Sequence, residues 1–95
     1  MDKRAVYVSP PFSRKVKKLK KQEKKELDDA VLDILNDPSI GEEKVGDLAG
    51  VLVYKFKINK QLILLSYTYD EDEINLLTFE SHQNFYKDLK NYRKA

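Results

Sequence analysis

The strongest candidate for acid–base chemistry in this sequence is the pair His82 and Tyr86. The two stand four residues apart, so on a helix they would share one face, and Lys90 and Arg93 would continue the same stripe. An imidazole and a phenol beside cations could give and take protons during phosphodiester cleavage. The same spacing fits a solvent-facing His next to a Tyr that packs on a sheet, and the residues alone leave both interpretations open.

A second candidate group consists of two lysines, Lys55 and Lys57, in a segment that alternates with apolar residues. On a β-strand they would project from the face opposite Tyr54 and Phe56, about 7 Å apart along the strand. Two ammonium groups at that spacing could hold a phosphate or stabilise a pentavalent phosphorane. Lysines that only keep an exposed sheet face soluble would give the same pattern.

Charge is distributed unevenly along the chain. Eight of the twelve residues from Arg14 to Lys25 are basic, whereas residues 26–47 contain eight acidic residues and one basic residue. The net charge of the whole chain is nevertheless only +2. A basic block within a nearly neutral chain indicates either one surface that faces a polyanion or a solvated helix face rich in Lys.

Apolar periodicity identifies the elements that must position these residues. Ser9 followed by two prolines is typical of a helix start, and Asn59-Lys60 is typical of a tight turn between strands. Residues 61–69 are apolar almost throughout, as in a central strand that is covered on both faces. The expected elements are a strand at residues 6–8, a helical hairpin or bent helix ending at residues 36–38, a loop over residues 38–50, strands at 51–58, 61–69 and 74–79, and a C-terminal helix.

This order predicts an α+β fold in a single domain spanning residues 1–95. We expect a four-stranded antiparallel sheet with the N-terminal helical hairpin packed on one face, followed by the C-terminal helix. The helical hairpin should bury its apolar stripe against Tyr54, Phe56 and the central strand. The residues of that stripe are Phe12, Val16, Leu19, Leu27, Val31, Ile34 and Leu35.

Composition excludes several classes of site. The chain has 95 residues, no cysteine and one histidine, so disulfides and thiolate metal sites are excluded, and we expect neither a metal nor another cofactor. The N-terminal residues lack the apolar core of a signal peptide, and no run approaches the roughly 18 apolar residues of a membrane-spanning helix. We therefore expect a cytoplasmic protein that does not bind membranes.

Four segments, taken together and in order, resemble the RelE/ParE toxins of bacterial type II toxin–antitoxin systems. They are residues 44–50 (KVGDLAG), 53–57 (VYKFK), 61–67 (QLILLSY) and 81–89 (SHQNFYKDL). The first three are similar to the family's order of leucine–x–glycine, basic strand and leucine-rich strand ending in tyrosine. The last is similar to the His-x-Asn-Phe-Tyr-x-Asp-Leu ending of one branch. Length and element order match over nearly the whole chain.

The resemblance implies a ribosome-dependent mRNA endonuclease that inhibits translation without a metal ion. In the nuclease branches a base assists attack by the ribose 2′-oxygen, cations stabilise the transition state, and an acid protonates the leaving 5′-oxygen. His82 and Tyr86 match catalytic positions of several branches, and Lys55 and Lys57 match basic positions on the second strand. Glu42 and Lys44 lie where some branches place an acidic or basic helper residue. The chain departs from the pattern at Gln61, where members often carry an Arg.

The resemblance also implies partners, namely a cognate antitoxin, the ribosome and mRNA. The expected RNA-binding residues are Lys17, Lys18, Lys21, Lys44 and Lys90. Two alternatives keep the same fold: a ParE-like toxin that inhibits DNA gyrase and cleaves nothing, and a non-toxic module whose basic helix binds nucleic acid. The combination of His82, Tyr86 and the two lysines favours the nuclease.

Overall fold

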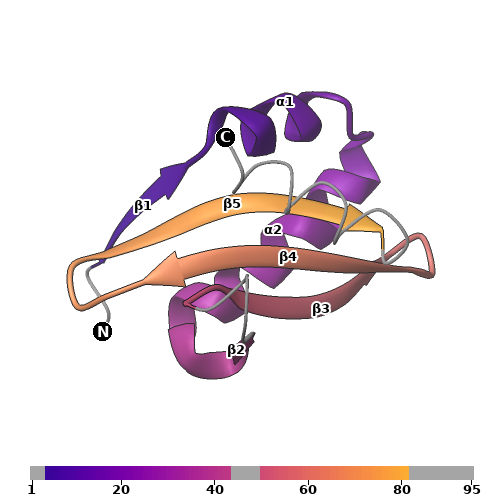
Figure 1. Cartoon of the computed structure of the whole chain (residues 1–95). Helices are drawn as coiled ribbons and strands as arrows, with labels where there is room; N and C mark the ends of the chain where they lie inside the picture. The colour runs from indigo at the N-terminus through magenta and orange to yellow at the C-terminus, as the bar shows by residue number, and fades with distance from the viewer. Residues whose placement is uncertain (1–3, 44–49, 82–95) are drawn as a thin grey trace.

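The computed structural model describes residues 4–43 and 50–81 of the chain. In these residues one strand and two helices come first, followed by a short 3₁₀ helix and four strands (Figure 1). The elements are β1 (Ala5–Val8), α1 (Pro10–Lys17), α2 (Lys21–Asn36), η1 (Pro38–Ile40), β2 (Glu42–Glu43), β3 (Leu52–Ile58), β4 (Gln61–Tyr69) and β5 (Glu73–Ser81). The predicted C-terminal helix lies outside the described residues, and so do Lys44, His82, Tyr86 and Lys90.

Local sequence signals fix the ends of the helices and the main turn. Ser9 caps α1, because its side chain accepts a hydrogen bond from the Phe12 N–H at 3.2 Å. The Lys20 N–H is satisfied by the Glu23 carboxylate at 2.8 Å, in the first turn of α2. Between β3 and β4, Asn59 and Lys60 both have positive φ, of 51° and 69°, as a tight two-residue hairpin turn requires. The predicted helix start and turn are confirmed.

The sheet is mixed and five-stranded, with the order β1-β5-β4-β3-β2, so the prediction of four antiparallel strands is wrong. β1 pairs in parallel with β5, whereas the other neighbours are antiparallel. The physical reason is the helical crossover, which returns the chain across the sheet before β3 begins, so that β1, β3 and β5 run in the same direction. The fifth strand, β2, lies within the segment predicted as a loop.

The central strand β4 is buried on both faces, as its apolar sequence predicts. Every residue from Ile63 to Tyr67 is buried. Leu65 and Tyr67 face the helices and join the main core, while Leu64 joins a smaller cluster with Val51 and Val53. Both faces of the sheet therefore hold apolar side chains, and β4 contributes to each.

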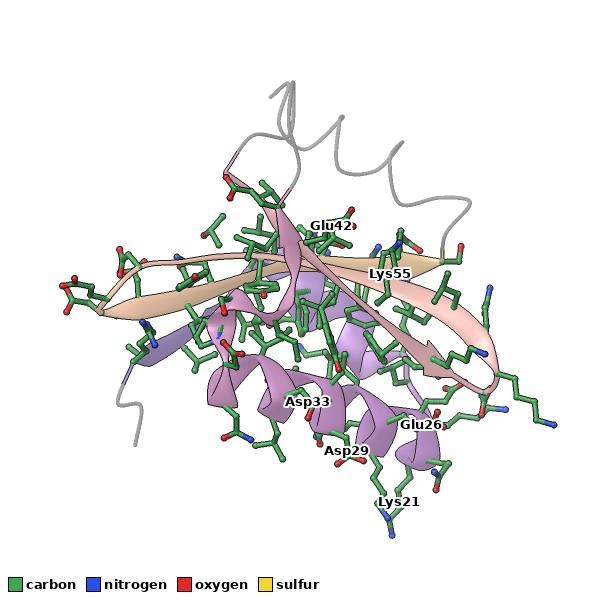
Figure 2. All side chains as sticks on the ribbon, turned by 90° about the horizontal axis from the view of Figure 1, so that it is seen from below. Lys21, Glu26, Asp29, Asp33, Glu42 and Lys55 are labelled. Atoms are coloured by element: carbon green, nitrogen blue, oxygen red, sulfur yellow. The ribbon has the colours of Figure 1, made fainter. Side chains whose placement is uncertain are left out.

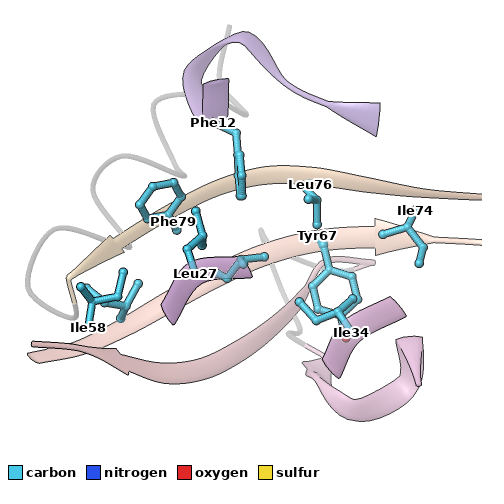
Figure 3. Close-up of a cluster of buried hydrophobic side chains, with 10 residues drawn as sticks. Phe12, Leu27, Ile34, Ile58, Tyr67, Ile74, Leu76 and Phe79 are labelled. Atoms are coloured by element: carbon cyan, nitrogen blue, oxygen red, sulfur yellow. The ribbon is translucent and has the colours of Figure 1, made fainter. Parts of the chain in front are cut away.

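The main core lies between the two helices and one face of the sheet (Figure 3). Phe12 packs edge-on against Phe79 of β5 with ring centroids 5.0 Å apart, and Leu27 and Ile34 of α2 are buried in the same cluster. The other predicted core residues are partly buried against this cluster, namely Val16, Leu19, Val31, Leu35, Tyr54 and Phe56. The predicted apolar stripe of the helical hairpin is confirmed.

Candidate functional site

Strand β3 carries Lys55 and Lys57 on the face of the sheet opposite α1 and α2. Tyr54 and Phe56 pack into the helix-covered core, so the alternation of a strand directs the two lysines to the other face. Both lysines are exposed, and they lie opposite Leu64 and Leu62 of β4. The predicted placement of the pair on one face is confirmed.

Glu42 of β2 shares this face. It lies directly opposite Val53 in the antiparallel pair, and residues opposed in this way project from the same side of a sheet. Val53 precedes Lys55 by two residues on the same face, so the Glu42 carboxylate and the Lys55 ammonium are diagonal neighbours across two strands. In Figure 2, Glu42 and Lys55 lie at the sheet, whereas Lys21 and Asp29 lie along α2 on its other side. One carboxylate and two ammonium groups thus share one surface.

A buried tyrosine of the central strand binds the segment that precedes Glu42. The Tyr67 hydroxyl donates a hydrogen bond to the Pro38 carbonyl at 2.7 Å and accepts one from the Gly41 N–H at 2.9 Å. Tyr67 is fully buried, and burial raises the pKa of its phenol above the ordinary value, so the hydroxyl keeps its proton and can donate. A Cβ atom at Gly41 would stand 2.5 Å from the Tyr67 oxygen. Glycine therefore fits beside this hydroxyl without a steric clash, and the two hydrogen bonds tie the segment that leads into β2 to the central strand.

The sequence did not assign Tyr67 a role, although a signal was present. A tyrosine in an apolar central strand must find a partner for its hydroxyl when the ring is buried. Here the partners are backbone groups of η1 and the residue that follows it, 29 and 26 positions earlier in the chain. The sequence therefore leads one to expect a hydrogen bond from the Tyr67 hydroxyl, but only the fold shows which groups are its partners.

The end of β5 lies level with the lysine pair. Ser81, which precedes His82 in the chain, pairs with Ile63 of β4, and Ile63 pairs with Phe56 of β3. Adjacent strands are about 4.8 Å apart, so the chain leaves β5 about 10 Å from the β3 position between Lys55 and Lys57. The C-terminal end of β5 therefore lies at the same level of the sheet as Lys55 and Lys57.

The predicted RNA-binding residues Lys17, Lys18 and Lys21 lie in the helical layer, not on the face of Lys55. All three are exposed around the junction of α1 and α2. The β3–β4 turn reaches the same end of the molecule, because the Asn59 side chain donates to Glu23 at 2.7 Å and its N–H to Glu26 at 3.3 Å.

The opposite end of the sheet is acidic. β4 begins beside the basic end and runs for nine residues, about 27 Å, to the turn at residues 70–72. The turn and the first residue of β5 are all acidic, namely Asp70, Glu71, Asp72 and Glu73. The molecule therefore has a basic end and an acidic end, although its net charge is small.

Residues 4–43 and 50–81 bring together no group of three His, Cys, Asp or Glu side chains that could bind a metal ion. None of the described helices combines the length and apolar character needed to cross a membrane.

Comparison with known proteins identifies the family and the fold of the chain. Residues 6–90 match the family model of the ParE-like toxins of type II bacterial toxin–antitoxin systems. The chain belongs to this family. It is therefore a toxin of the RelE/ParE kind, and the family assigned from its motifs is confirmed. No curated protein sequence matches the chain.

Solved structures share the fold of this toxin at low sequence identity. A chain of the intact RelBE toxin–antitoxin complex of E. coli is 18% identical, with a TM-score of 0.64, over 82% of this chain and 95% of that chain. A mutant of E. coli RelE in the free state is 16% identical, with a TM-score of 0.65, over 93% and 96%. A chain of the RelE–RelB complex of Pyrococcus horikoshii is 15% identical, with a TM-score of 0.56, over 85% and 96%. Identities this low establish the fold alone.

Proposed function

We propose that this toxin is a ribosome-dependent mRNA endonuclease that works in the cytoplasm without a metal ion. The observation that carries the proposal is the exposed pair Lys55 and Lys57 on the sheet face opposite the helices, with Glu42 beside it. A face built only for solubility has no need of a carboxylate diagonal to one of its cations, on a strand that follows the segment hydrogen-bonded to the buried Tyr67. A site for in-line phosphoryl chemistry needs both kinds of group.

In the proposed reaction the ribose 2′-oxygen attacks the adjacent phosphorus, and the bond from phosphorus to the 5′-oxygen of the next nucleotide breaks. The 2′-hydroxyl gives its proton to a base, and the leaving 5′-oxygen takes a proton from an acid. The products are a cyclic 2′,3′-phosphate and a free 5′-hydroxyl, with no other reactant. His82 exchanges one of these protons, since imidazole is the side chain whose unperturbed pKa lies near neutrality.

The other residues have complementary roles in this mechanism. Lys55 and Lys57 hold the phosphate and stabilise the extra negative charge of the transition state. Glu42 supplies a carboxylate beside Lys55 that can accept the 2′-hydroxyl proton while His82 protonates the leaving oxygen. Tyr86 orients the substrate or shares the proton transfer.

Binding to the ribosome would depend on the basic end of the molecule. We assign Lys17, Lys18 and Lys21 to contacts with ribosomal RNA phosphates, and we propose the same role for Lys44 and Lys90. The regulating partner is proposed to be an antitoxin encoded beside the toxin, whose flexible chain folds on contact and brings acidic side chains to this basic surface.

Cleavage of mRNA on programmed ribosomes, read by primer extension, tests the function. The wild-type toxin should cut mRNA in the A site, and His82→Ala should reduce the cleavage rate by about 10²–10⁴-fold. Circular dichroism and antitoxin binding control for folding of the variant. Full cleavage by a folded His82→Ala protein would remove His82 from the mechanism.

The second candidate function is inhibition of DNA gyrase, which the ParE-like description of the matching family favours. A supercoiling assay with purified gyrase, run beside the ribosome assay, separates the two. Inhibition of supercoiling together with intact mRNA would transfer the assignment to gyrase. Growth that continues on expression of the toxin alone would contradict both.

A further inference from the structure

One lysine of the basic block differs from its neighbours. The block from Arg14 to Lys25 contains eight basic residues, all within the described part of the chain, and seven of them are exposed whereas Lys15 is half-buried. The Lys15 ammonium forms an ion pair with the Glu80 carboxylate of β5, and the two side chains are 27% and 21% exposed. It also donates a hydrogen bond to the Phe79 carbonyl at 3.1 Å. Because this pair is partly sheltered from water, salt screens it less than it screens an ion pair on the open surface.

Lys15 reaches Glu80 at the outer edge of β5. β1 pairs with β5 only as far as Leu76, so within the described residues no strand lies beside the last part of β5 on this side. Helix α1 follows β1 directly in the chain and contacts β5 there. The Lys15 ammonium therefore supplies, at this edge, the donor for the Phe79 carbonyl that a neighbouring strand would otherwise provide.

Glu80 projects from the face of the sheet that carries Lys55. Lys55 lies opposite Leu64 of β4, and Leu64 lies opposite Glu80 of β5, so the three residues form one row across three strands. Residues opposed in this way project from the same face. Since adjacent strands are about 4.8 Å apart, the backbone positions of Lys55 and Glu80 are about 10 Å apart. A lysine of the helical layer thus neutralises a carboxylate of the opposite face by reaching the edge of the sheet.

Glu80 also borders the basic end of the molecule. A hollow of about 470 Å³ lies between α1, the β3–β4 turn and the end of β5, and its lining includes Lys15, Lys18, Asn59, Glu80 and Ser81. Lys18 is one of the exposed residues that the proposed function assigns to RNA phosphates. An RNA strand that contacts both Lys55 and Lys18 therefore passes the Glu80 carboxylate.

We propose that Lys15 neutralises Glu80 and holds it at the edge of β5, and thereby keeps this carboxylate from competing with RNA phosphates for Lys55. Extended lysine and glutamate side chains together span the distance across Leu64, so a Glu80 released from Lys15 could pair with Lys55. It would also repel the RNA, because a separation of about 10 Å is close to the Debye length of about 8 Å at physiological ionic strength. Lys15 is therefore a positioning residue that acts on substrate binding through Glu80. This inference rests on the proposed function, since it requires RNA on this face.

The alternative is that Lys15 binds RNA directly, as is proposed for Lys17 and Lys18. Its surroundings favour the role through Glu80. The Lys15 ammonium is engaged with a carboxylate and a backbone carbonyl of β5, whereas Lys17 and Lys18 are exposed. A phosphate would have to displace the Glu80 carboxylate in order to take the place of that partner.

Cleavage kinetics on programmed ribosomes, measured for the wild type, Lys15→Met, Glu80→Gln and the double variant, test the proposal. Lys15→Met should raise the KM by about three- to tenfold and leave kcat nearly unchanged, since an uncompensated charge at this distance acts on binding. Glu80→Gln should lower the KM, because it removes the carboxylate and leaves the Lys15 charge. Lys15→Met should then have little effect in the Glu80→Gln background. An equal rise in KM in both backgrounds would overturn the proposal, and a wild type that cleaves nothing would overturn the proposed function as well.

Lys18→Met is the matched control, because Lys18 lines the same hollow and is assigned to direct contact with phosphate. Its effect on KM should be the same with and without Glu80→Gln. Lys15→Arg, which keeps the charge, should stay close to the wild type. The effect of Lys15→Met should also shrink as KCl is raised from about 0.05 M to about 0.3 M.

Circular dichroism and urea unfolding show whether each variant is folded. If Lys15→Met does not fold, Glu80→Gln alone decides the question, since a raised KM of the folded Glu80→Gln protein would overturn the proposal. A lowered KM that returns to the wild-type value at high salt would support it.

Discussion

The two faces of strand β3 are built for different purposes. On the helix-covered face, Tyr54 and Phe56 stack with ring centroids 6.3 Å apart and pack against the main core. On the other face, Val53 is buried in a small cluster, and then Lys55 and Lys57 follow in exposed positions. One strand thus contributes to the stability of the fold with every second residue and to the proposed chemistry with the residues between.

This difference explains how a toxin of 95 residues can hold a charged site in place. Groups that act on a phosphate must be fixed to within a fraction of an ångström, and strands of a packed sheet fix them better than loops do. Tyr54 and Phe56 pack β3 against the main core, and this packing holds the strand that carries Lys55 and Lys57 on its other face. The comparison predicts that the two faces respond differently to substitution.

The largest effect is expected on the charged face. Replacing Lys55 and Lys57 together by Met should reduce mRNA cleavage by about 10³-fold or more, since loss of one preorganised electrostatic group costs about 10²–10³-fold. Stability should change by less than about 0.5 kcal/mol, because both side chains are exposed. Urea unfolding and cleavage on programmed ribosomes measure the two quantities. The double Lys→Arg variant, which keeps both charges, is the control, and a fully active Met variant would remove the pair from the site.

The helix-covered face should show the reverse behaviour. Leu27 of α2 is buried in the main core, and Leu27→Ala should destabilise the fold by about 2–5 kcal/mol through lost burial and a cavity. Cleavage per folded molecule, measured well below the unfolding temperature, should remain close to that of the wild type. A folded Leu27→Ala protein that has lost activity would show that the two faces are not separable.

The different character of the two faces of β3 could be predicted from the sequence, because apolar and charged residues alternate along this strand. The alternation around Tyr54 and Lys55 shows which residues project from the same face of β3. The apolar run of residues in β4 shows that β4 is a central strand. The direction and neighbour of β1 could not be predicted, since four residues with no charge pattern fit either edge in either direction. Those features depend on the path of the helical crossover.

The candidate site was predictable to the same extent. The common face of Lys55 and Lys57 follows from their spacing, whereas the position of Glu42 does not. A strand of two residues has no periodicity, and Glu42 is brought to the sheet by the contact of Gly41 with Tyr67, 26 residues away. Contacts between distant segments of this kind are the part of a site that a single sequence does not reveal.

An intermediate effect is expected at Tyr67. This residue lies in the main core on the helix-covered face, and its hydroxyl binds Gly41, the residue before Glu42. Tyr67→Phe leaves the Gly41 N–H and the Pro38 carbonyl without this partner, which should cost about 1–3 kcal/mol. Gly41→Ala should cost a similar amount, because its Cβ atom would stand 2.5 Å from the Tyr67 oxygen. The double variant should lose less stability than the two single variants lose together. Removal of the Tyr67 hydroxyl also removes the nearest contact of the Cβ atom introduced at position 41. Strict additivity in urea unfolding would show that the two residues act independently.

The same variants sharpen the role of Glu42. If Tyr67 acts on cleavage through the position of Glu42, then Tyr67→Phe should lower the cleavage rate in the wild-type background and have little further effect in a Glu42→Gln background. A merely structural effect would reduce cleavage by the same factor in both backgrounds. Cleavage by the wild type, the two single variants and the double variant measures this directly.

The smallest effect is expected at the margin of the helix-covered face, where the Tyr54 hydroxyl donates a hydrogen bond to Asp33 at 2.8 Å. This bond, followed by burial and the charge of Asp33, raises the pKa of Tyr54 above its ordinary value. The folded protein therefore keeps the phenol proton to higher pH than the unfolded chain does. The stabilisation is complete below the unfolded pKa of about 10 and is lost as the pH rises through the folded pKa.

Tyr54→Phe tests this dependence on pH. The variant should be less stable than the wild type by about 0.5–1.5 kcal/mol at pH 8, since one hydrogen bond is lost. The difference should shrink above pH 10, where the wild type begins to lose the same contribution. Urea unfolding at pH 8, 9, 10 and 11 measures the two proteins side by side, and the titration of lysines and of Tyr67 cancels because both proteins contain them. A stability difference that stays constant across this range would show that the bond to Asp33 does not hold the Tyr54 proton.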